Sequence, residues 1–450
     1  MEKDLTVGKP LNVIMSFGIP LLLGNIFQQL YNMIDAAIVG KTLGGHALAA
    51  VGATGSINFL VLGFCIGICN GFAIPLAREF GAKNNERLRS GFINGVILCI
   101  IFAFIITISM VLLCFKILIS INTPSDILDR AYNYIIVIFC GIPSYFIYNF
   151  SAGVLRSVGD SKTPVKWLII GSILNIILDL LFIITFKLDV FGAALATVIA
   201  QFVSGIGCCI HIYKNFPVFK IKIKDLKCDF SIMKYLCIAG LPMGLQTSIT
   251  AIGTVMIQSA VNSLGTDYVT VVTAANKILI FLYCPFDTMG TTMATYSSQN
   301  LGAGRLDRLN KGLKSCIFIG AIYSALAFII IFGFADNLNS LFLDNNSMHL
   351  LPIARQYSMI NASFLFPLAL VNIIRFMIQG LGFSPLATVA GIFEMVARGF
   401  VSYLTAIYGF LATCFASPFA WILADLFLIP AYIYCYRNLK SIFHEKQMKT

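Results

Sequence analysis

Acidic side chains inside apolar stretches are the residues of this chain best suited to ion chemistry. Asp35 lies in LYNMIDAAIVG, and the residues between Lys9 and Asp35 carry no charge. As a helix, this stretch would reach most of the way across a bilayer. A carboxylate is costly there, so we predict that Asp35 has a functional role.

A second polar group lies in ILNIILDLLF, where Asn175 and Asp179 are four residues apart. That spacing places both side chains on one face of a helix. The hydroxyl of Thr197, in GAALATVIAQ, can donate or accept a hydrogen bond. The alternative interpretation is that Asp35 and Asp179 only hydrogen-bond neighbouring helices and so hold them together.

Composition predicts the kind of structure in which these residues lie. Of the 450 residues, 58% are hydrophobic and only 11% are charged, and the mean hydropathy is +0.87. A soluble domain is roughly 25% charged. The apolar runs are continuous and do not alternate, which excludes a transmembrane β-barrel. The sequence therefore predicts an all-α, polytopic membrane protein without a soluble domain.

Charged residues, Pro and Gly divide the chain into twelve apolar segments of spanning length. The predicted spans are 11–40, 47–77, 90–116, 130–155, 165–186, 190–213, 235–264, 268–299, 312–342, 352–381, 385–409 and 411–436. The first has no cleavage site after a short core, so we expect it to be retained and not removed as a signal peptide. Six segments contain a proline that can kink a helix, namely Pro20, Pro75, Pro143, Pro242, Pro285 and Pro367.

The basic residues predict the orientation. If the N-terminus is cytoplasmic, most of the 31 Lys and Arg residues fall in cytoplasmic loops and tails. The loops on the other side hold only Lys41, Lys116, Arg130, Lys187 and Arg355. This bias predicts that both termini are cytoplasmic. Basic loops beside an anionic leaflet also account for the net charge of +11, so we expect no nucleic-acid partner.

The two halves of the sequence resemble each other. The matching pairs are GIPLLLGNIFQQ (18–29) with GLPMGLQTSITA (240–251), REFGAKNNERLRSG (78–91) with QNLGAGRLDRLNKG (299–312), and LRSVGDSKTP (155–164) with IQGLGFSP (378–385). Their offsets are 222, 221 and 223 residues (240 − 18, 302 − 81 and 382 − 159). The repeat predicts an N-terminal lobe at 1–213, a basic linker at 214–234, a C-terminal lobe at 235–437 and a cytoplasmic tail at 438–450. A binding site between two such repeats is the common arrangement.

These motifs resemble those of the multidrug and toxic compound extrusion (MATE) family over essentially the whole chain. The matching stretches, in order, are GIPLLLGNIFQQLYNMIDAAIVG, AREFGAKN, LRSVGDSKTP, GAALATVIAQ and SQNLGAG. The resemblance implies a V-shaped pair of six-helix lobes and cation-coupled export of organic, often cationic, compounds through the inner membrane of a prokaryote. It is closest to the prokaryotic branch whose coupling carboxylates lie in the N-terminal lobe.

The resemblance also implies that Asp35, Asn175, Asp179 and Thr197 converge inside the N-terminal lobe. Two carboxylates in an apolar pocket cannot both stay ionised cheaply. Either one holds a proton near neutral pH, or a sodium ion neutralises the pair while Asn175 and Thr197 complete an oxygen shell. At the repeat offset Asp35 corresponds to the apolar Ile257, so the fold itself does not require the charge. We expect no cofactor besides the coupling ion.

Other polar residues are candidates for a substrate cavity. Gln28, Tyr31 and Asn32 lie seven, four and three residues before Asp35 and therefore on its helix face. Hydrogen bonding between helices would explain them equally well. Asp287, in YCPFDTMGTTM, is a further candidate for attracting substrate.

The remaining ionisable residues suggest no metal centre. Glu394 and Arg398 form an i,i+4 pair that most simply neutralises itself, and the sequence leaves the roles of these two residues and of Asp425 open. The 13 cysteines lie mostly in apolar runs and are interpreted as small apolar residues. No Cys/His cluster has the spacing of a metal site.

The sequence thus predicts an antiporter that works by alternating access. The Gly-containing stretches REFGAKN and QNLGAGR do not fit the P-loop pattern, so the energy source should be an ion gradient and no ATPase partner is expected. The expected partners are small organic substrates and membrane lipid, and a monomer is sufficient. The alternative is a lipid-linked precursor flippase of the same superfamily. An enzyme is not indicated, since H-E-x-x-H and G-x-S-x-G motifs do not occur.

Overall fold

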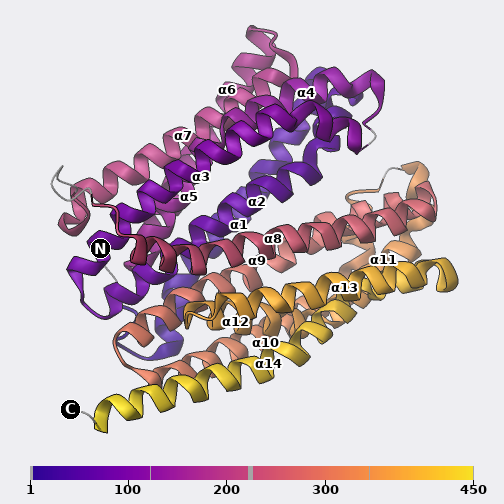
Figure 1. The fold of residues 1–450 in the computed structure, drawn as a ribbon. Helices are drawn as coiled ribbons and strands as arrows, with labels where there is room; N and C mark the ends of the chain where they lie inside the picture. Colours follow the sequence, from indigo (N-terminus) through magenta and orange to yellow (C-terminus); the bar gives the residue numbers. More distant parts are fainter. Residues whose placement is uncertain (1–3, 122, 221–226, 344, 449–450) are drawn as a thin grey trace. The chain divides into compact units, whose positions relative to one another are not determined.

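The computed structural model describes residues 4–121, 123–220, 227–343 and 345–448. These residues form helices joined by short connections, and no β-strand occurs among them (Figure 1). The first half contains α1 (Pro10–Leu43), α2 (Gly45–Gly81), α3 (Asn85–Ser120), α4 (Ser125–Cys140), α5 (Ile142–Ser157), α6 (Lys162–Leu180), a π-helical turn η1 (Leu181–Thr185) and α7 (Asp189–Asn215). The second half contains α8 (Phe230–Ser263), α9 (Thr266–Gly302), α10 (Leu306–Ser340), α11 (Leu351–Ser363), α12 (Leu365–Gly380), α13 (Ser384–Tyr408) and α14 (Phe410–Met448).

The helices confirm the predicted all-α membrane architecture. Among the described residues, 10 helices are individually long and apolar enough to cross a membrane. Two bent pairs, α4 with α5 and α11 with α12, bring the number to 12 if each pair is one span. The fourth and tenth predicted segments are therefore each built from two helices.

The bends occur at two of the six prolines in the predicted spans. The α4–α5 pair bends by 46° and the α11–α12 pair by 45°. Pro143 lies in the first turn of α5, and Pro367 lies in the first turn of α12. A proline in the first turn is tolerated because its missing N–H would have no partner within the helix. The other four, Pro20, Pro75, Pro242 and Pro285, lie inside helices that continue past them.

Contacts divide the chain into two compact units. The first unit contains Ile19–Ser248, and the second contains Leu5–Gly18 together with the chain from Ile249 onward. Both α1 and α8 therefore begin in one unit and end in the other. The lobes at 1–213 and 235–437 are defined by the sequence repeat and stay predictions. Residues 221–226 of the linker at 214–234 lie outside the described residues.

The backbone repeats as the sequence does. Gly44 and Gly265 precede α2 and α9 with φ angles of 85° and 107°, in the left-handed region that favours glycine. Their offset is 221 residues (265 − 44). Positive φ angles also occur at three further matching pairs, Lys83 with Gly304, Gly159 with Gly382, and Lys187 with Gly409. The two halves thus form the same turns in the same order.

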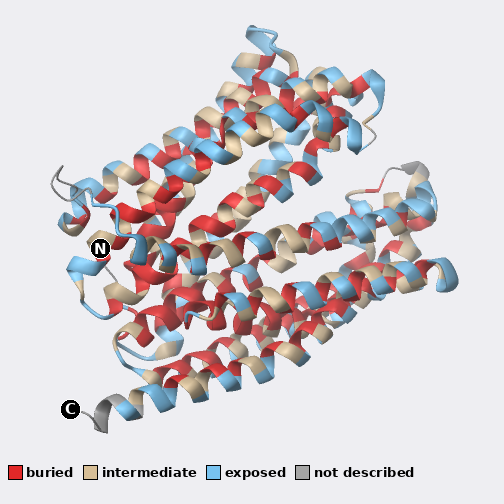
Figure 2. Cartoon of the chain, in the orientation of Figure 1, coloured by how far each residue is buried: buried red, intermediate tan, exposed pale blue. Residues whose placement is uncertain are grey.

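Each unit has its own apolar core. In the first unit α2 packs against α5, and α5 packs against α7, around the buried side chains of Phe72, Phe139 and Phe146. Part of α8 comes so close to α2 that a Cβ on Gly67 would lie 2.7 Å from the Cα of Gly244. Small residues permit such backbone contact between membrane helices. In the second unit α9 packs against α12. Buried residues occur along the helices of both units (Figure 2).

Candidate functional site

The first unit brings two carboxyl groups together between α1 and α6. Asp179 is fully buried and Asp35 is half-buried. Their side chains lie within hydrogen-bonding reach of each other. In each, Oδ1 is buried and has no hydrogen-bond partner among the described residues. Two ionised carboxylates would repel at this separation, so the arrangement calls for a shared proton or a bound cation.

The amide of Asn175 joins this pair to α7. With the orientation that satisfies all its neighbours, Asn175 donates from Nδ2 to Oδ2 of Asp179 at 2.8 Å. The same nitrogen lies 3.3 Å from the hydroxyl of Tyr31, and Oδ1 accepts from the backbone N–H of Thr197 at 2.9 Å. Asn175 is 0% exposed, so water cannot reach its amide and these protein groups supply its hydrogen bonds.

Close helix packing explains how the sequence positions these groups. A Cβ on Gly24 of α1 would lie 2.7 Å from Cγ2 of Val165 in α6. A Cβ on Gly171 would lie 3.0 Å from the carbonyl oxygen of Ala200 in α7. The missing side chains let α6 approach both neighbours, and Asn175 follows Gly171 by about one turn. Directly after Asp179 the helix widens into the π-helical turn η1, a feature that is frequent at functional sites.

Two tyrosines that the sequence did not single out also face the pair. Tyr134 of α4 and Tyr145 of α5 are buried, and both interact electrostatically with Asp35. Tyr134 also interacts with Asp179. Their hydroxyls add donors and acceptors to the pocket. The sequence signal was weak, because tyrosine is an ordinary residue in a membrane helix and carries no charge.

The four residues predicted for ion coupling are therefore neighbours. Asp35, Asp179 and Asn175 are in contact as described, and Thr197 bonds Asn175 through its backbone. The Thr197 hydroxyl donates to the carbonyl oxygen of Ala193 at 3.0 Å. Carboxylate, amide and hydroxyl oxygens are ligands that suit Na⁺ as a hard cation. In the described part of the chain, no three His, Cys, Asp or Glu residues are clustered as metal ligands.

The residues predicted for a substrate cavity differ in burial and do not all lie in the same unit. Tyr31 belongs to the hydrogen-bond network of Asn175. Gln28 is half-buried and Asn32 is exposed, and no described hydrogen bond joins either to the carboxyl pair. Asp287 is an exposed residue of α9 in the second unit. The cavity assignments of these residues stay predictions.

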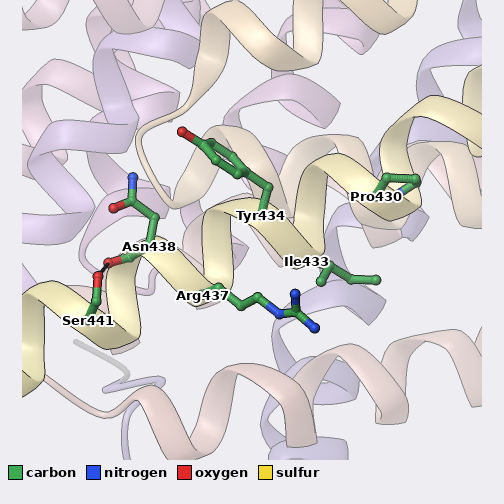
Figure 3. Close-up of a pocket in the computed structure, with 6 residues that line it drawn as sticks. All are labelled: Pro430, Ile433, Tyr434, Arg437, Asn438 and Ser441. Atoms are coloured by element: carbon green, nitrogen blue, oxygen red, sulfur yellow. Dashed lines mark hydrogen bonds between the residues drawn. The ribbon is translucent and has the colours of Figure 1, made fainter.

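A hollow of about 560 Å³ on α14 is a poor alternative site. It is lined by Pro430, Ile433, Tyr434, Arg437, Asn438 and Ser441 (Figure 3). All of these belong to one helix, so a small molecule there would be held from one side only. Exposed Tyr and Arg side chains near a helix end are typical of a membrane–water interface.

The fold and the sequence repeat define the class of protein to which the chain belongs. This is a polytopic helical membrane protein built from two repeated halves, the plan of many secondary transporters. The chain belongs to the MATE family, since the MatE family model matches residues 20–181 and 242–404. The two matches begin 222 residues apart (242 − 20), which agrees with the offset of the sequence repeat. The predicted family is thereby confirmed, and it is a family of multidrug efflux transporters.

Similar proteins support this assignment. The chain is 29% identical over 342 residues to the probable multidrug resistance protein YoeA of Bacillus subtilis, covering 73% of this chain and 72% of that protein. It is 24% identical over 239 residues to the multidrug export protein MepA of Staphylococcus aureus, covering 52% of each. A multidrug resistance MATE transporter solved in an outward-facing conformation has the same fold, with a TM-score of 0.90 at 24% identity over 97% of this chain and 98% of that chain.

Proposed function

We propose that this protein is an antiporter that exports organic compounds from a prokaryotic cell in exchange for protons or sodium ions. The observation that carries this proposal is the carboxyl pair of half-buried Asp35 and fully buried Asp179 in the first unit. The pair is costly for folding, and each of its carboxyl groups has an oxygen atom without a hydrogen-bond partner that a cation could use. The repeat counterpart of Asp35, Ile257, is apolar. A costly group that the fold does not require is best explained by function.

The carboxyl pair supports coupling to a cation. One charge that enters along a membrane potential of about 100 mV supplies about 2.3 kcal/mol. At 1.36 kcal/mol for each factor of ten, that energy sustains a gradient of about 50-fold for an uncharged substrate. The cation and the substrate must favour different conformations, because a ligand that binds both equally shifts nothing. We infer that cation entry rearranges the helices around Asp35 and releases the substrate outward.

In the amide orientation that satisfies its neighbours, the hydrogen bonds of Asn175 are compatible with a shared proton between Asp35 and Asp179. Its Nδ2 points to Asp179, while its Oδ1 is used by the backbone N–H of Thr197. A shared proton needs no change in these bonds. A sodium ion that used Oδ1 of Asn175 would require the amide to turn and give up that hydrogen bond. Both ions stay in the proposal, and their gradients can be imposed separately.

Further features of the proposal follow from the family and the charge pattern. We propose that both termini are cytoplasmic, that the protein lies in the inner membrane, that its partners are small organic substrates and membrane lipid, and that a monomer suffices. The similar proteins named for multidrug resistance favour drug export over the flippase alternative. A FAD transporter of Shewanella oneidensis is 21% identical over 337 residues, so an anionic flavin belongs in any substrate panel.

The test is efflux from proteoliposomes that contain the purified protein, with a fluorescent organic cation and with proton and sodium gradients imposed one at a time. Asp35→Asn keeps the size of the side chain and removes its charge. We expect this variant to fold and to lose gradient-driven efflux. Asp126→Asn, which changes an exposed acid of α4, should transport as the wild type does. Wild-type efflux by Asp35→Asn would refute the assignment.

A further inference from the structure

The second unit contains a buried cluster of charged residues that the proposed mechanism does not use. Its members are Arg375 of α12, Glu394 and Arg398 of α13, and Asp425 of α14, each between 2% and 7% exposed. Arg375 forms an ion pair with Glu394, and Nη2 of Arg398 lies 3.3 Å from Oε2 of the same glutamate. Glu394 therefore lies between two guanidinium groups. The i,i+4 pair expected from the sequence is present, but it is part of a larger group.

The charges of the cluster depend on Asp425. Two arginines and one glutamate leave a net charge of +1 in the protein interior. Asp425 interacts electrostatically with Arg375 and brings the total to zero when it is ionised. When Asp425 is protonated, the cluster returns to +1. One carboxyl group therefore switches the charge of a buried site.

Asp425 has the surroundings of a group that can gain and lose a proton. Its Oδ1 is buried without a hydrogen-bond partner among the described residues, and Nε of Arg375 is also unpartnered. Burial favours the neutral acid, whereas the positive charge of Arg375 favours the carboxylate. The two effects oppose each other, so neither form is fixed.

The other helices around Asp425 add few charges. Tyr283 of α9 and Tyr357 of α11 interact electrostatically with Arg398. The ring of Tyr283 also contacts Trp421 of α14, about one turn before Asp425, at a centroid distance of 5.9 Å. These phenols are neutral at ordinary pH. Arg375 is therefore the main charged neighbour that sets the proton affinity of Asp425.

Two helices of the cluster, α13 and α14, correspond to helices of the candidate site in the first unit. By the repeat offset α13 corresponds to α6, and α14 corresponds to α7 (384 − 162 = 222 and 410 − 189 = 221). Arg398 also donates to the carbonyl oxygen of Thr250 at 3.4 Å in α8, the counterpart of α1. The second unit thus places charged residues on α13, the counterpart of the helix that carries Asp179, but on other helices as well and with different residues.

We propose that the second unit contains a second proton-binding site, in which Asp425 takes up one proton while Arg375 pairs with Glu394 alone. The proton comes from water and bonds to a carboxylate oxygen of Asp425. Its release restores the interaction of Asp425 with Arg375. The role of this site in transport rests on the antiport function proposed above, whereas proton binding itself does not and can be measured without transport.

Infrared difference spectroscopy of the purified full-length protein tests the binding step. Spectra recorded across a pH series report the carbonyl band of each protonated buried acid. We expect Asp425→Asn to lose one such band that the wild type shows, and we expect Asp336→Asn, an exposed acid paired with Arg355, to retain it. In Arg375→Gln the band should persist to a pH higher by roughly 1–3 units, because the stabilising charge is gone. Spectra of Asp425→Asn that match the wild type, or no shift in Arg375→Gln, would overturn the proposal.

Two further measurements distinguish a failure of the proton site from misfolding of the variant and from a failure of the proposed antiport function. If Asp425→Asn does not fold, the double variant Arg375→Gln/Asp425→Asn leaves only the Glu394–Arg398 pair and so keeps the cluster neutral, and the same band must be absent from it. In proteoliposomes the number of protons exchanged per substrate should fall by one in Asp425→Asn. An unchanged number would contradict a coupling role for Asp425. Loss of the band in Asp425→Asn together with a wild type that shows no coupled efflux would support the proton site and refute the antiport function.

Discussion

Asn175→Ala is the substitution that probes the carboxyl pair most directly. It removes the donor that lies 2.8 Å from Oδ2 of Asp179 and the acceptor that lies 2.9 Å from the backbone N–H of Thr197. A hydrogen bond to a charged group contributes about 1.5–3 kcal/mol. This bond stabilises the ionised carboxylate, so its loss makes the pair hold a proton more tightly. Divided by 1.36 kcal/mol per pH unit, the effect is about 1–2 units.

The assay is proton-driven efflux in proteoliposomes as a function of pH. The pH of half-maximal efflux should rise by about 1–2 units in Asn175→Ala, because the pair releases its proton only at higher pH. Asn149→Ala is the matched control, since the Asn149 amide bonds the carbonyl oxygen of Tyr145 within its own helix at 2.8 Å. That variant should keep the wild-type midpoint. An active Asn175→Ala protein with an unchanged midpoint would show that Asn175 does not bond the carboxyl pair.

Three further predictions concern the scaffold. Gly67→Val should lower the melting temperature and the yield of monodisperse protein, because a Cβ there would lie 2.7 Å from the Cα of Gly244 and overpacking costs about 1–3 kcal/mol. Asn84→Ala should destabilise the start of α3 by about 1 kcal/mol, measured by hydrogen exchange of its first turn, since the Asn84 side chain caps that helix at 3.1 Å. Arg308→Met should expose the N-terminal segment to limited proteolysis, because Arg308 bonds two of its carbonyl oxygens at 2.8 and 3.3 Å; Arg305→Met, at an exposed position, should not.

The membrane architecture could be predicted because its signals are local. Long uncharged runs identify spans without any knowledge of packing, and the constant repeat offset follows from the sequence alone. The two bends could not be located in this way. All six prolines look alike in the sequence, but only Pro143 and Pro367 lie in the first turn of a new helix. Where a helix restarts depends on its neighbours.

In the candidate site, too, some residues could be predicted from the sequence and others could not. Asp35 and Asp179 were visible because charge is rare in apolar segments, and Asn175 was visible through its helical spacing from Asp179. Tyr134 and Tyr145 gave no such signal, since an aromatic residue in a membrane helix is ordinary until its hydroxyl has a charged neighbour. In the second unit the Glu394–Arg398 spacing was also readable. The contribution of Arg375 comes from another helix and depends on tertiary contact.

The assignment of the N-terminal segment Leu5–Gly18 to the second unit has a consequence for the biosynthesis of the protein. The backbone N–H of Leu5 donates to Oε1 of Gln299 at 3.0 Å, across 294 residues of sequence. At about 5–20 residues per second, the ribosome needs about 15–60 s to make that partner. During this interval the first residues of the chain have left the ribosome and have no native contact to the second unit. Leu5–Gly18 is therefore synthesised long before its partners in the second unit and reaches its native contacts only after Gln299 has been made.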